Sequence, residues 1–315
     1  MVVLDGRTAN PGDLSWESFE KVADVTVYES TADHDIASRM ADAQIVYTNR
    51  TPLCREIILN APKLQFIGVL GTGYNNVDVA AAGERGIPVT NVPDYGTEAV
   101  AQFVFALLLE VCHRTAHHHH AVLEGRWEEA GGCFWDYPLL ELYGKTMGII
   151  GFGRIGQATG RIAQGFGMRV IACDSRGKRE GMASLEEVLQ QSDVLSLHCP
   201  LLPETRELIN RQTIERMKDG AILINTSRGG LICEQDLREA LLSDKVYAAA
   251  ADVAAVEPMT RESPLFGLEN CIITPHIAWA PREARARLLK TAAENLLAWM
   301  DGNPVHVVNR QYMQQ

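Results

Sequence analysis

The chain has 315 residues, of which 46% are hydrophobic and 22% charged, and its formal net charge is −11. This composition is typical of a globular protein with a large buried core, and the length favours two domains. A negative charge of this size argues against a nucleic-acid partner, because the phosphate backbone would be repelled.

The seven cysteines are scattered, odd in number and free of any C-x-x-C pair. They predict free thiols in a reducing cytoplasm rather than a disulfide framework. The start, "MVVLDGRTAN", has no basic segment and no long apolar one, so we expect no signal peptide. The longest apolar stretch, "VAQFVFALLLEVC", is interrupted by Gln102 and Glu110, and we expect no membrane span.

Short strand-like runs alternate with helical patterns in the first third of the chain. The runs are "MVVLDG", "VTVYES", "AQIVYTN", "LQFIGVLG" and "IPVTNVP", bounded by Gly, Pro and Asn. Residues 15–22 and 33–41 favour helices between them. This alternation predicts a parallel sheet.

From Thr97 the pattern predicts one long helix of nearly thirty residues, which Thr97 can cap and Gly125 can end. It contains five of the nine histidines, His113 and His117–His120. Three of these share one face of such a helix and could chelate a metal. No carboxylate or cysteine in this stretch completes a catalytic set. We therefore expect a polar helix face and no functional metal.

A second series follows a loop rich in aromatic residues. Its strand-like runs are "TMGIIGFG", "RVIACD", "VLSLHCP", "AILINTS", "YAAAADV" and "CIITPH", and residues 154–166 and 234–242 favour helices. A last helix at 282–300 and the run "VHVVN" come after this series is complete. The C-terminus could therefore return to the first domain and make it discontinuous, which the pattern permits without demonstrating.

The segment "MGIIGFGRIGQATGRIAQGFGMRVIACD" is the most specific local signal. Gly151 permits a tight turn, Gly153 lets the backbone approach a pyrophosphate, and Gly156 allows close packing of helix on strand. Arg154 and Ile155 complete the loop, and the pyrophosphate would lie at the positive helix N-terminus. Strand, helix, second strand and terminal acid together predict a dinucleotide site.

Asp174 ends the second strand of this unit, 18 residues after Gly156, where a carboxylate accepts hydrogen bonds from the adenosine ribose. It favours NAD, because a 2′-phosphate would be repelled. Arg176 and Lys178 follow closely and leave some use of NADP open.

Three later strand ends carry polar residues in apolar surroundings. Arg228 follows one strand, Asp252 and Glu257 the next, and His276 the one after. Ligands of open α/β sheets bind beyond the carboxyl ends of the strands, so all four would face the nicotinamide end of the cofactor. Singly, they could be a surface cation, a turn residue and a core histidine; together they favour a site.

Their chemistry suits the reduction of a 2-keto acid. Arg228 offers a planar fork for a carboxylate and can polarise the ketone. His276 can give a proton near neutral pH, and neutral His276 would take it back in the oxidation direction. Glu257 can hydrogen-bond the imidazole, fix its tautomer and favour its protonated form.

The chain resembles the D-isomer-specific 2-hydroxyacid dehydrogenases along essentially its whole length. The matching stretches are "GTGYNNVD", the glycine loop, "NTSRGGLI", "DVAAVEP" and "TPHIAW". "TNRTPL", "FWDYPLLELYGKTMGIIGFGRIG" and "TPHIAWAPREARARL" are most similar to the glycerate dehydrogenase, or hydroxypyruvate reductase, branch.

The resemblance implies Arg228, Glu257 and His276 as a catalytic triad and the backbone around Thr72 and Gly73 as the site of the substrate carboxylate. It implies a flavodoxin-like substrate domain made of residues 1–96 and 285–315, and a Rossmann NAD domain of residues 97–284 inserted in it. The active site would lie in the cleft between them. A homodimer is implied, with the long helix and aromatic loop at its interface.

We expect further cofactor contacts beyond the glycine loop and Asp174. They come from Thr97, Cys199, Pro200, Thr205, Thr226 and Asp252.

One departure from the family pattern and two alternative functions stay open. Ala254 stands where many relatives have Phe, so pocket shape and substrate size are in doubt. A D-lactate or phosphoglycerate type of dehydrogenase is one alternative, and the latter would need extra cations, for which Arg50 and Arg7 are candidates. A non-catalytic NAD-sensing regulator is another, and such proteins often carry a long disordered tail.

Overall fold

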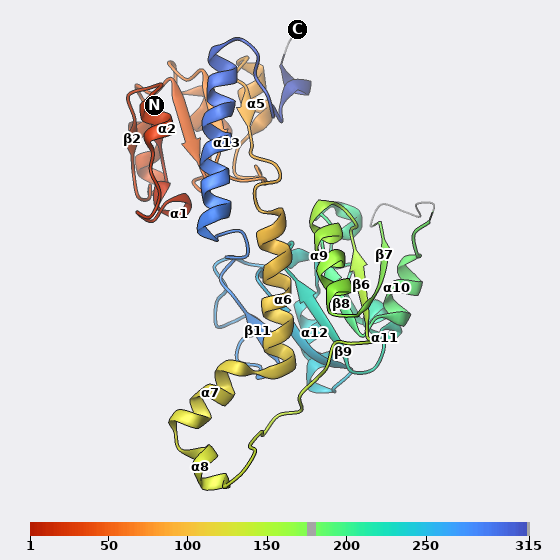
Figure 1. Ribbon diagram of the computed structural model, residues 1–315. Coiled ribbons are helices and arrows are strands. Elements are labelled where there is room, and N and C mark those ends of the chain that lie inside the picture. The colour runs from red at the N-terminus through yellow and green to blue at the C-terminus, as the bar shows by residue number, and fades with distance from the viewer. Residues whose placement is uncertain (175–180, 314–315) are drawn as a thin grey trace. The chain divides into compact units, whose positions relative to one another are not determined.

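The computed structural model describes residues 1–174 and 181–313. The chain divides into two compact units, each with its own parallel sheet (Figure 1). The terminal unit comprises Met1–Gly96 and Ala280–Gln315, and the central unit comprises Thr97–Trp279. The predicted α/β class with two parallel sheets is confirmed.

The terminal unit contains a sheet with the order β2-β1-β3-β4-β5, which is the flavodoxin-like order. The strands are β1 (Val2–Val3), β2 (Thr26–Val27), β3 (Ile45–Thr48), β4 (Phe66–Val69) and β5 (Val89–Thr90). The helices are α1 (Gly6–Ala9), α2 (Glu17–Glu20), α3 (Ile36–Met40), α4 (Arg55–Leu59), α5 (Val79–Glu84) and α13 (Arg282–Met300), with short 3₁₀ turns η1 (Asp33–Asp35) and η4 (Arg310–Tyr312). β3 and β4 are fully buried, as expected for central strands of a parallel sheet.

The C-terminal segment pairs with β5. Val307 forms an antiparallel bridge with Thr90, and the buried Asn309 side chain accepts a hydrogen bond from the Val89 amide at 2.9 Å. The run "VHVVN" is thus a single bridge, not a full strand. The two compact units divide between Trp279 and Ala280, just before helix α13, and the domain boundary at residue 285 stays a prediction.

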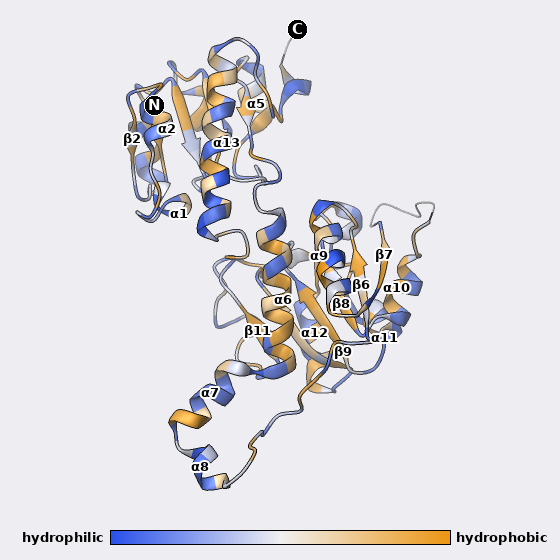
Figure 2. Cartoon of the chain, viewed as in Figure 1, coloured by the Kyte–Doolittle hydropathy of each residue, from blue (hydrophilic) through white to orange (hydrophobic). Residues whose placement is uncertain are grey.

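The central unit begins with α6 (Thr97–His113), whose buried residues pack into the core against the sheet. Its strands are β6 (Thr146–Ile150), β7 (Arg169–Cys173), β8 (Val194–Leu197), β9 (Ala221–Asn225), β10 (Val246–Ala251) and β11 (Cys271–Ile273). Its further helices are α7 (Thr115–Leu123), α8 (Arg126–Ala130), α9 (Arg154–Gly165), α10 (Leu185–Gln191), α11 (Arg211–Arg216) and α12 (Glu234–Leu242), with 3₁₀ turns η2 (Pro203–Thr205) and η3 (Gly229–Leu231). Figure 2 shows the apolar strands β6 and β7 beside the more polar helix α10.

The sheet of the central unit has the order β11-β10-β9-β8-β6-β7. Beyond β7, the Ala183 amide donates a hydrogen bond to the Ala172 carbonyl at 3.0 Å. This segment stands where the dinucleotide-binding fold has its third strand. With it, the strands up to β10 follow the usual order 3-2-1-4-5-6, and β11 adds a seventh member beside β10. The chain therefore reverses direction across the sheet between β6 and β8, and this is the point where such folds bind ligands.

The predicted single helix from Thr97 to Gly125 is wrong. It breaks at Arg114, which has a left-handed φ of 42°, and α6 and α7 are bent by 52°. The His118 ring bonds the carbonyl oxygens of His113 and Arg114, and the Arg114 guanidinium lies 3.8 Å above the Tyr137 ring. These side-chain contacts replace helical ones at the break. α7, α8 and the loop after them form an arm (residues 115–140) that projects from the rest of the central unit (Figure 1).

Among the described residues, no single helix has both the length and the apolar composition needed to cross a bilayer. α6 and α7 meet these criteria only as a bent pair, on length and composition alone.

Candidate active site

The glycine loop links β6 to α9 at the reversal point of the central sheet. Gly151 has φ 95°, and a Cβ placed on it would lie 2.6 Å from the Cys199 amide nitrogen. A Cβ on Gly156 would lie 2.4 Å from the Gly151 carbonyl oxygen. Both positions therefore require glycine, as the fingerprint predicts.

The loop fits a bound pyrophosphate. No atom lies within 4 Å of the Cβ position of Gly153, and this residue is the N-cap of the twelve-residue helix α9 without a side-chain cap. The first backbone N–H groups of a helix have no partner within the helix, and they attract anions. Arg154 and Ile155 are the first residues of α9. The space above Gly153 leaves these donors accessible to a phosphate group.

Asp174 directly follows β7 and is partly buried. Its position at the carboxyl end of the second strand is the one that the ribose role requires. Arg176 and Lys178, which could favour NADP, lie outside the described residues.

A histidine–glutamate pair occupies the carboxyl edge beyond β10 and β11. Nδ1 of His276 lies 2.7 Å from Oε2 of Glu257, and the two side chains are 32% and 31% exposed. The pair is therefore packed on one side and open to a ligand on the other. A carboxylate only accepts hydrogen bonds, so Nδ1 carries a proton and Nε2 is the atom available for proton transfer.

The backbone of His276 is held in an uncommon conformation. Its φ is 58°, in the left-handed region that costs a residue other than glycine about 1–3 kcal/mol. Its carbonyl accepts a hydrogen bond from the Trp279 indole at 2.9 Å. Strain of this kind persists only where surrounding contacts fix it, and it is common at functional sites.

Asp252 supplies much of that support. Its fully buried carboxylate accepts hydrogen bonds from the Thr274 hydroxyl at 2.6 Å, the Ile277 amide at 2.9 Å and the Ala278 amide at 2.7 Å. These three donors flank His276 on both sides. The carboxylate therefore positions the histidine, and the predicted contact between Asp252 and the cofactor stays a prediction.

Arg228 follows β9, next to the strand that leads to Glu257. Its side chain is exposed, and its carbonyl accepts a hydrogen bond from the Asn225 amide group at 2.8 Å. The Ser227 hydroxyl donates to the Cys199 carbonyl at 2.6 Å, which ties this loop to the one after β8. Arg228, Glu257 and His276 thus follow three adjacent strands of one sheet.

The loop after β8 contains several of the other predicted contacts. Cys199 is buried beside Gly151, Pro200 is exposed, and the Thr205 hydroxyl donates to the Pro200 carbonyl at 2.7 Å. Thr226, after β9, has a buried hydroxyl with no hydrogen-bond partner among the described residues. An unsatisfied buried hydroxyl at this edge fits a site that a ligand completes. Thr97 is the first residue of α6.

His198 is a feature of this loop that sequence reasoning missed. Burial lowers the pKa of its imidazole to about 4, and its Nε2 lies 2.9 Å from the Ser196 hydroxyl. The ring is therefore neutral near pH 7 and adds no charge beside the glycine loop. Its place after an apolar strand is the only signal that the sequence offers.

In the terminal unit, Thr72 and Gly73 follow β4 and are exposed. The Thr72 hydroxyl donates to the Val92 carbonyl at 2.9 Å, and the Asn91 side chain donates to the Thr72 carbonyl at 2.7 Å. Arg50 follows the neighbouring strand β3, whereas Arg7 lies in α1, 3.5 Å from Glu29. Both arginines therefore follow strands of the parallel sheet at its carboxyl edge, and the Arg7 side chain has an acidic neighbour there.

The histidine cluster is organised differently from the predicted single face. His117 and His118 both approach Asp136, at 2.8 Å and 3.6 Å. Burial raises the pKa of Asp136, but hydrogen bonds from Arg126 and His117 outweigh this effect and lower the pKa to about 2. In residues 1–174 and 181–313, no group of three His, Cys, Asp or Glu side chains is arranged to hold a metal ion.

The model of the D-isomer specific 2-hydroxyacid dehydrogenase NAD-binding domain matches residues 105–278, more than half of the chain. The chain belongs to this family. The match spans the glycine loop, Arg228, Glu257 and His276, so the central unit carries the family's NAD-binding domain. The protein is thus an oxidoreductase of small 2-hydroxy and 2-keto acids that uses a nicotinamide dinucleotide.

Individual relatives agree with this family over the whole chain. The hydroxypyruvate reductase of Blautia hydrogenotrophica is 53% identical, covering 98% of this chain and 99% of its own. The D-lactate dehydrogenase of Aquifex aeolicus, solved with NAD and lactic acid, has a TM-score of 0.82 at 27% identity and covers 96% of each chain. An acyclic imino acid reductase solved with NADPH and D-Arg has a TM-score of 0.83 at 29% identity, covering 98% of this chain and 100% of its own.

Proposed function

We propose that this dehydrogenase reduces hydroxypyruvate to D-glycerate with NADH, and glyoxylate to glycolate as a secondary reaction. The observation that carries the proposal is the 2.7 Å contact of His276 with Glu257, one strand away from Arg228. The 53% identity to a hydroxypyruvate reductase over nearly the full length supports this choice of substrate.

Arg228 binds and polarises the substrate. Its exposed guanidinium has five N–H donors in a planar fork, which matches the geometry of a carboxylate and also reaches a neighbouring ketone oxygen. The positive charge of the guanidinium near this oxygen stabilises the negative charge that develops on it as the carbonyl is reduced.

His276 donates the proton to that oxygen. Its Nδ1 is bound to Glu257, which orients the ring, so the donor is Nε2. In the oxidation direction the neutral ring accepts the proton from the hydroxyl group. The bound dihydronicotinamide supplies the hydride.

The cofactor is held by Gly151, Gly153, Arg154, Ile155 and Gly156 at its pyrophosphate. Asp174 accepts hydrogen bonds from the adenosine ribose and disfavours a 2′-phosphate, so NAD is preferred over NADP.

Other residues complete the cofactor and substrate contacts. Cys199, Pro200, Thr205, Thr226, Asp252 and Thr97 contact the cofactor. The unsatisfied buried hydroxyl of Thr226 is the feature that most supports this set. Thr72 and Gly73, exposed after β4, bind the substrate carboxylate through their backbone.

The protein acts as a homodimer through the arm. Large apolar side chains are exposed there, including Leu123 at 69%, Trp127 at 55% and Trp135 at 61%. Such a concentration of exposed apolar surface is typical of an interface.

All seven cysteines are free, which supports a reducing cytoplasmic location.

Oxidation of NADH by the purified protein with hydroxypyruvate, followed by chiral analysis of the product, tests the proposal. We expect turnover and D-glycerate. Tight NADH binding without turnover of any 2-keto acid would instead indicate a regulator, and L-glycerate would contradict the family's stereochemistry.

A further inference from the structure

Glu234 is the first residue of α12, and its carboxylate holds both sides of the loop that carries Glu257. Oε1 accepts a hydrogen bond from the Ala255 amide at 2.8 Å, and Oε2 accepts one from the Ser263 hydroxyl at 2.9 Å. Ala255 precedes Glu257 in the chain and Ser263 follows it. One carboxylate therefore closes this loop at its base.

The peptide bond between Ala254 and Ala255 is fixed from a second direction. A Cβ placed on Gly229 would lie 1.9 Å from the Ala254 carbonyl carbon and 2.4 Å from the Ala255 nitrogen. The backbone that follows Arg228 thus packs directly against the Ala254–Ala255 peptide. The N–H group of this peptide is the one that donates a hydrogen bond to Glu234. This contact joins the loop of Arg228 to the loop of Glu257.

The adjacent peptide, between Val253 and Ala254, contacts Glu257 itself. The Ala254 amide donates to Oε1 of Glu257 at 3.3 Å, while Oε2 lies 2.7 Å from Nδ1 of His276. A shift of this backbone therefore moves the carboxylate that orients the imidazole. Misplacement of a reacting group by about 1 Å can cost about 10²-fold in rate.

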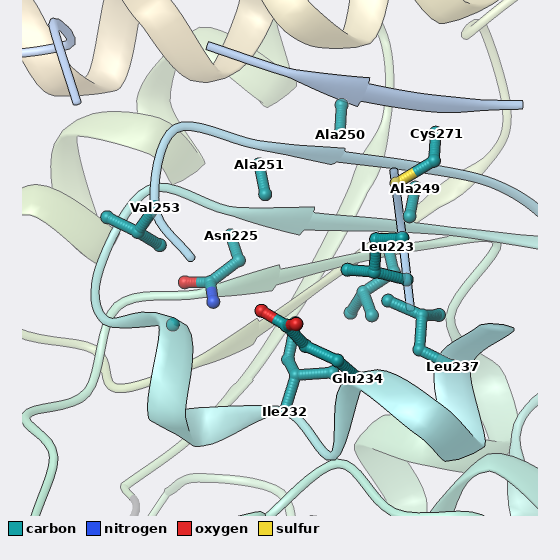
Figure 3. Close-up of a pocket in the computed structure, with 12 residues that line it drawn as sticks. Leu223, Asn225, Ile232, Glu234, Leu237, Ala249, Ala250, Ala251, Val253 and Cys271 are labelled. Carbon is teal, nitrogen blue, oxygen red and sulfur yellow. The ribbon is translucent and has the colours of Figure 1, made fainter. Parts of the chain in front are cut away.

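The side chain of Glu234 is partly buried. It lines an internal cavity of about 10 Å³ together with Asn225, Val253 and Cys271, with the Glu234 and Asn225 side chains at the same end (Figure 3). That volume is close to the minimum for one water molecule. Burial first, and the charge of Glu234 second, raise the pKa of the Cys271 thiol to about 12. Hydrogen bonds in such surroundings are stronger than in water.

We propose that Glu234 is a positioning residue of the dehydrogenase reaction, which fixes the Ala254–Ala255 peptide so that Glu257 faces His276 while Arg228 stays beside them. The inference rests on the proposed function, because it assigns Glu234 to the support of the proposed triad. Asn225 supports the Arg228 side of the same cavity through its hydrogen bond to the Arg228 carbonyl.

Three variants of α12 test this role. Glu234→Ala removes both acceptors, and Glu234→Gln keeps the shape, one acceptor for the Ala255 amide and one group that can bond the Ser263 hydroxyl. Glu239→Ala is the matched control, because Glu239 is a carboxylate of the same helix that pairs with Arg211. The measurements are kcat, KM for NADH, and hydrogen exchange of the backbone between residues 254 and 263.

We expect Glu234→Ala to lower kcat by about 10- to 100-fold while KM for NADH changes by less than about twofold. Exchange in the loop should rise in this variant alone, and Glu234→Gln should recover most of the wild-type rate. If Glu234→Ala does not fold, Ser263→Ala removes one of the two contacts and should give a smaller change in the same direction.

A Glu234→Ala protein with wild-type kcat and wild-type loop exchange would overturn the inference, as would an equal loss in the Gln variant. The readouts separate this failure from that of the proposed function. A wild-type protein that turns over no 2-keto acid refutes the function, whereas loop exchange still reports whether Glu234 holds the Glu257 loop.

Discussion

At the scale of single residues, the His276 imidazole is the group whose removal should affect proton transfer more than binding. His276 is held in a left-handed conformation by the three hydrogen bonds of Asp252 and is oriented by Glu257. Its Nε2 is the atom that we propose as the proton donor to the substrate oxygen. We therefore expect the chemical step, rather than cofactor binding, to depend on this ring.

His276→Ala should lower kcat for hydroxypyruvate reduction by about 10²- to 10⁴-fold, the usual contribution of general acid catalysis. The dissociation constant of NADH should stay within a few-fold of wild type, as measured by fluorescence titration. His34→Ala, an exposed histidine of the terminal unit, is the control and should leave both values unchanged. Near-normal turnover of His276→Ala would refute the role as proton donor.

Arg228→Lys keeps the positive charge but loses the planar fork, so it separates charge from geometry. We expect a lower kcat and a higher KM for the keto acid in steady-state kinetics, by about tenfold in kcat/KM, which corresponds to about 1.4 kcal/mol. An unchanged kcat/KM would show that Arg228 does not bind the carboxylate in a bidentate manner.

At the scale of elements, the candidate site residues follow the ends of strands, and this placement could be predicted from sequence. The glycine loop after β6 and the polar residues after β9, β10 and β11 stand at the edge where the alternating pattern places them. Such prediction works because the sheet is parallel, so every strand in it ends at the same edge.

The contacts that support those residues were not predictable. Glu234 follows Arg228 by a short interval in a stretch without any motif, and only the folded chain brings it to Ala255 and Ser263. The break at Arg114 is similar, because the Arg114 guanidinium contacts the Tyr137 ring, which lies beyond the predicted helix. Both the Glu234 contacts and the helix break involve residues distant in the chain, and the local sequence pattern carries no information on such contacts.

We propose that Asp174, at the end of strand β7, selects NAD over NADP, and an Asp174→Ala variant tests this role. In Asp174→Ala the repulsion of a 2′-phosphate is removed, so the ratio of kcat/KM for NADH over NADPH should fall by about tenfold or more, an effect of about 1.4 kcal/mol. The rate at saturating NADH should stay close to wild type. An unchanged ratio, measured with both cofactors at one hydroxypyruvate concentration, would exclude the ribose role.

At the scale of the whole molecule, the exposed apolar side chains of the arm predict that two copies of the chain form a dimer. Leu123→Asp places a charge at an exposed apolar position of the arm, and burying an unpaired charge is costly. We expect light scattering to give a dimer for the wild type and a monomer for this variant. Leu242→Asp, at an exposed leucine of α12, should remain dimeric. A monomeric wild-type protein would contradict the proposed homodimer.

The most direct test of the central claim is the specificity of the purified protein with NADH. The values of kcat/KM are compared side by side for hydroxypyruvate, glyoxylate, pyruvate and phosphohydroxypyruvate. The triad and the likeness to a hydroxypyruvate reductase predict that hydroxypyruvate is the best substrate, followed by glyoxylate, and that both exceed pyruvate. A clear preference for pyruvate or phosphohydroxypyruvate would contradict the account.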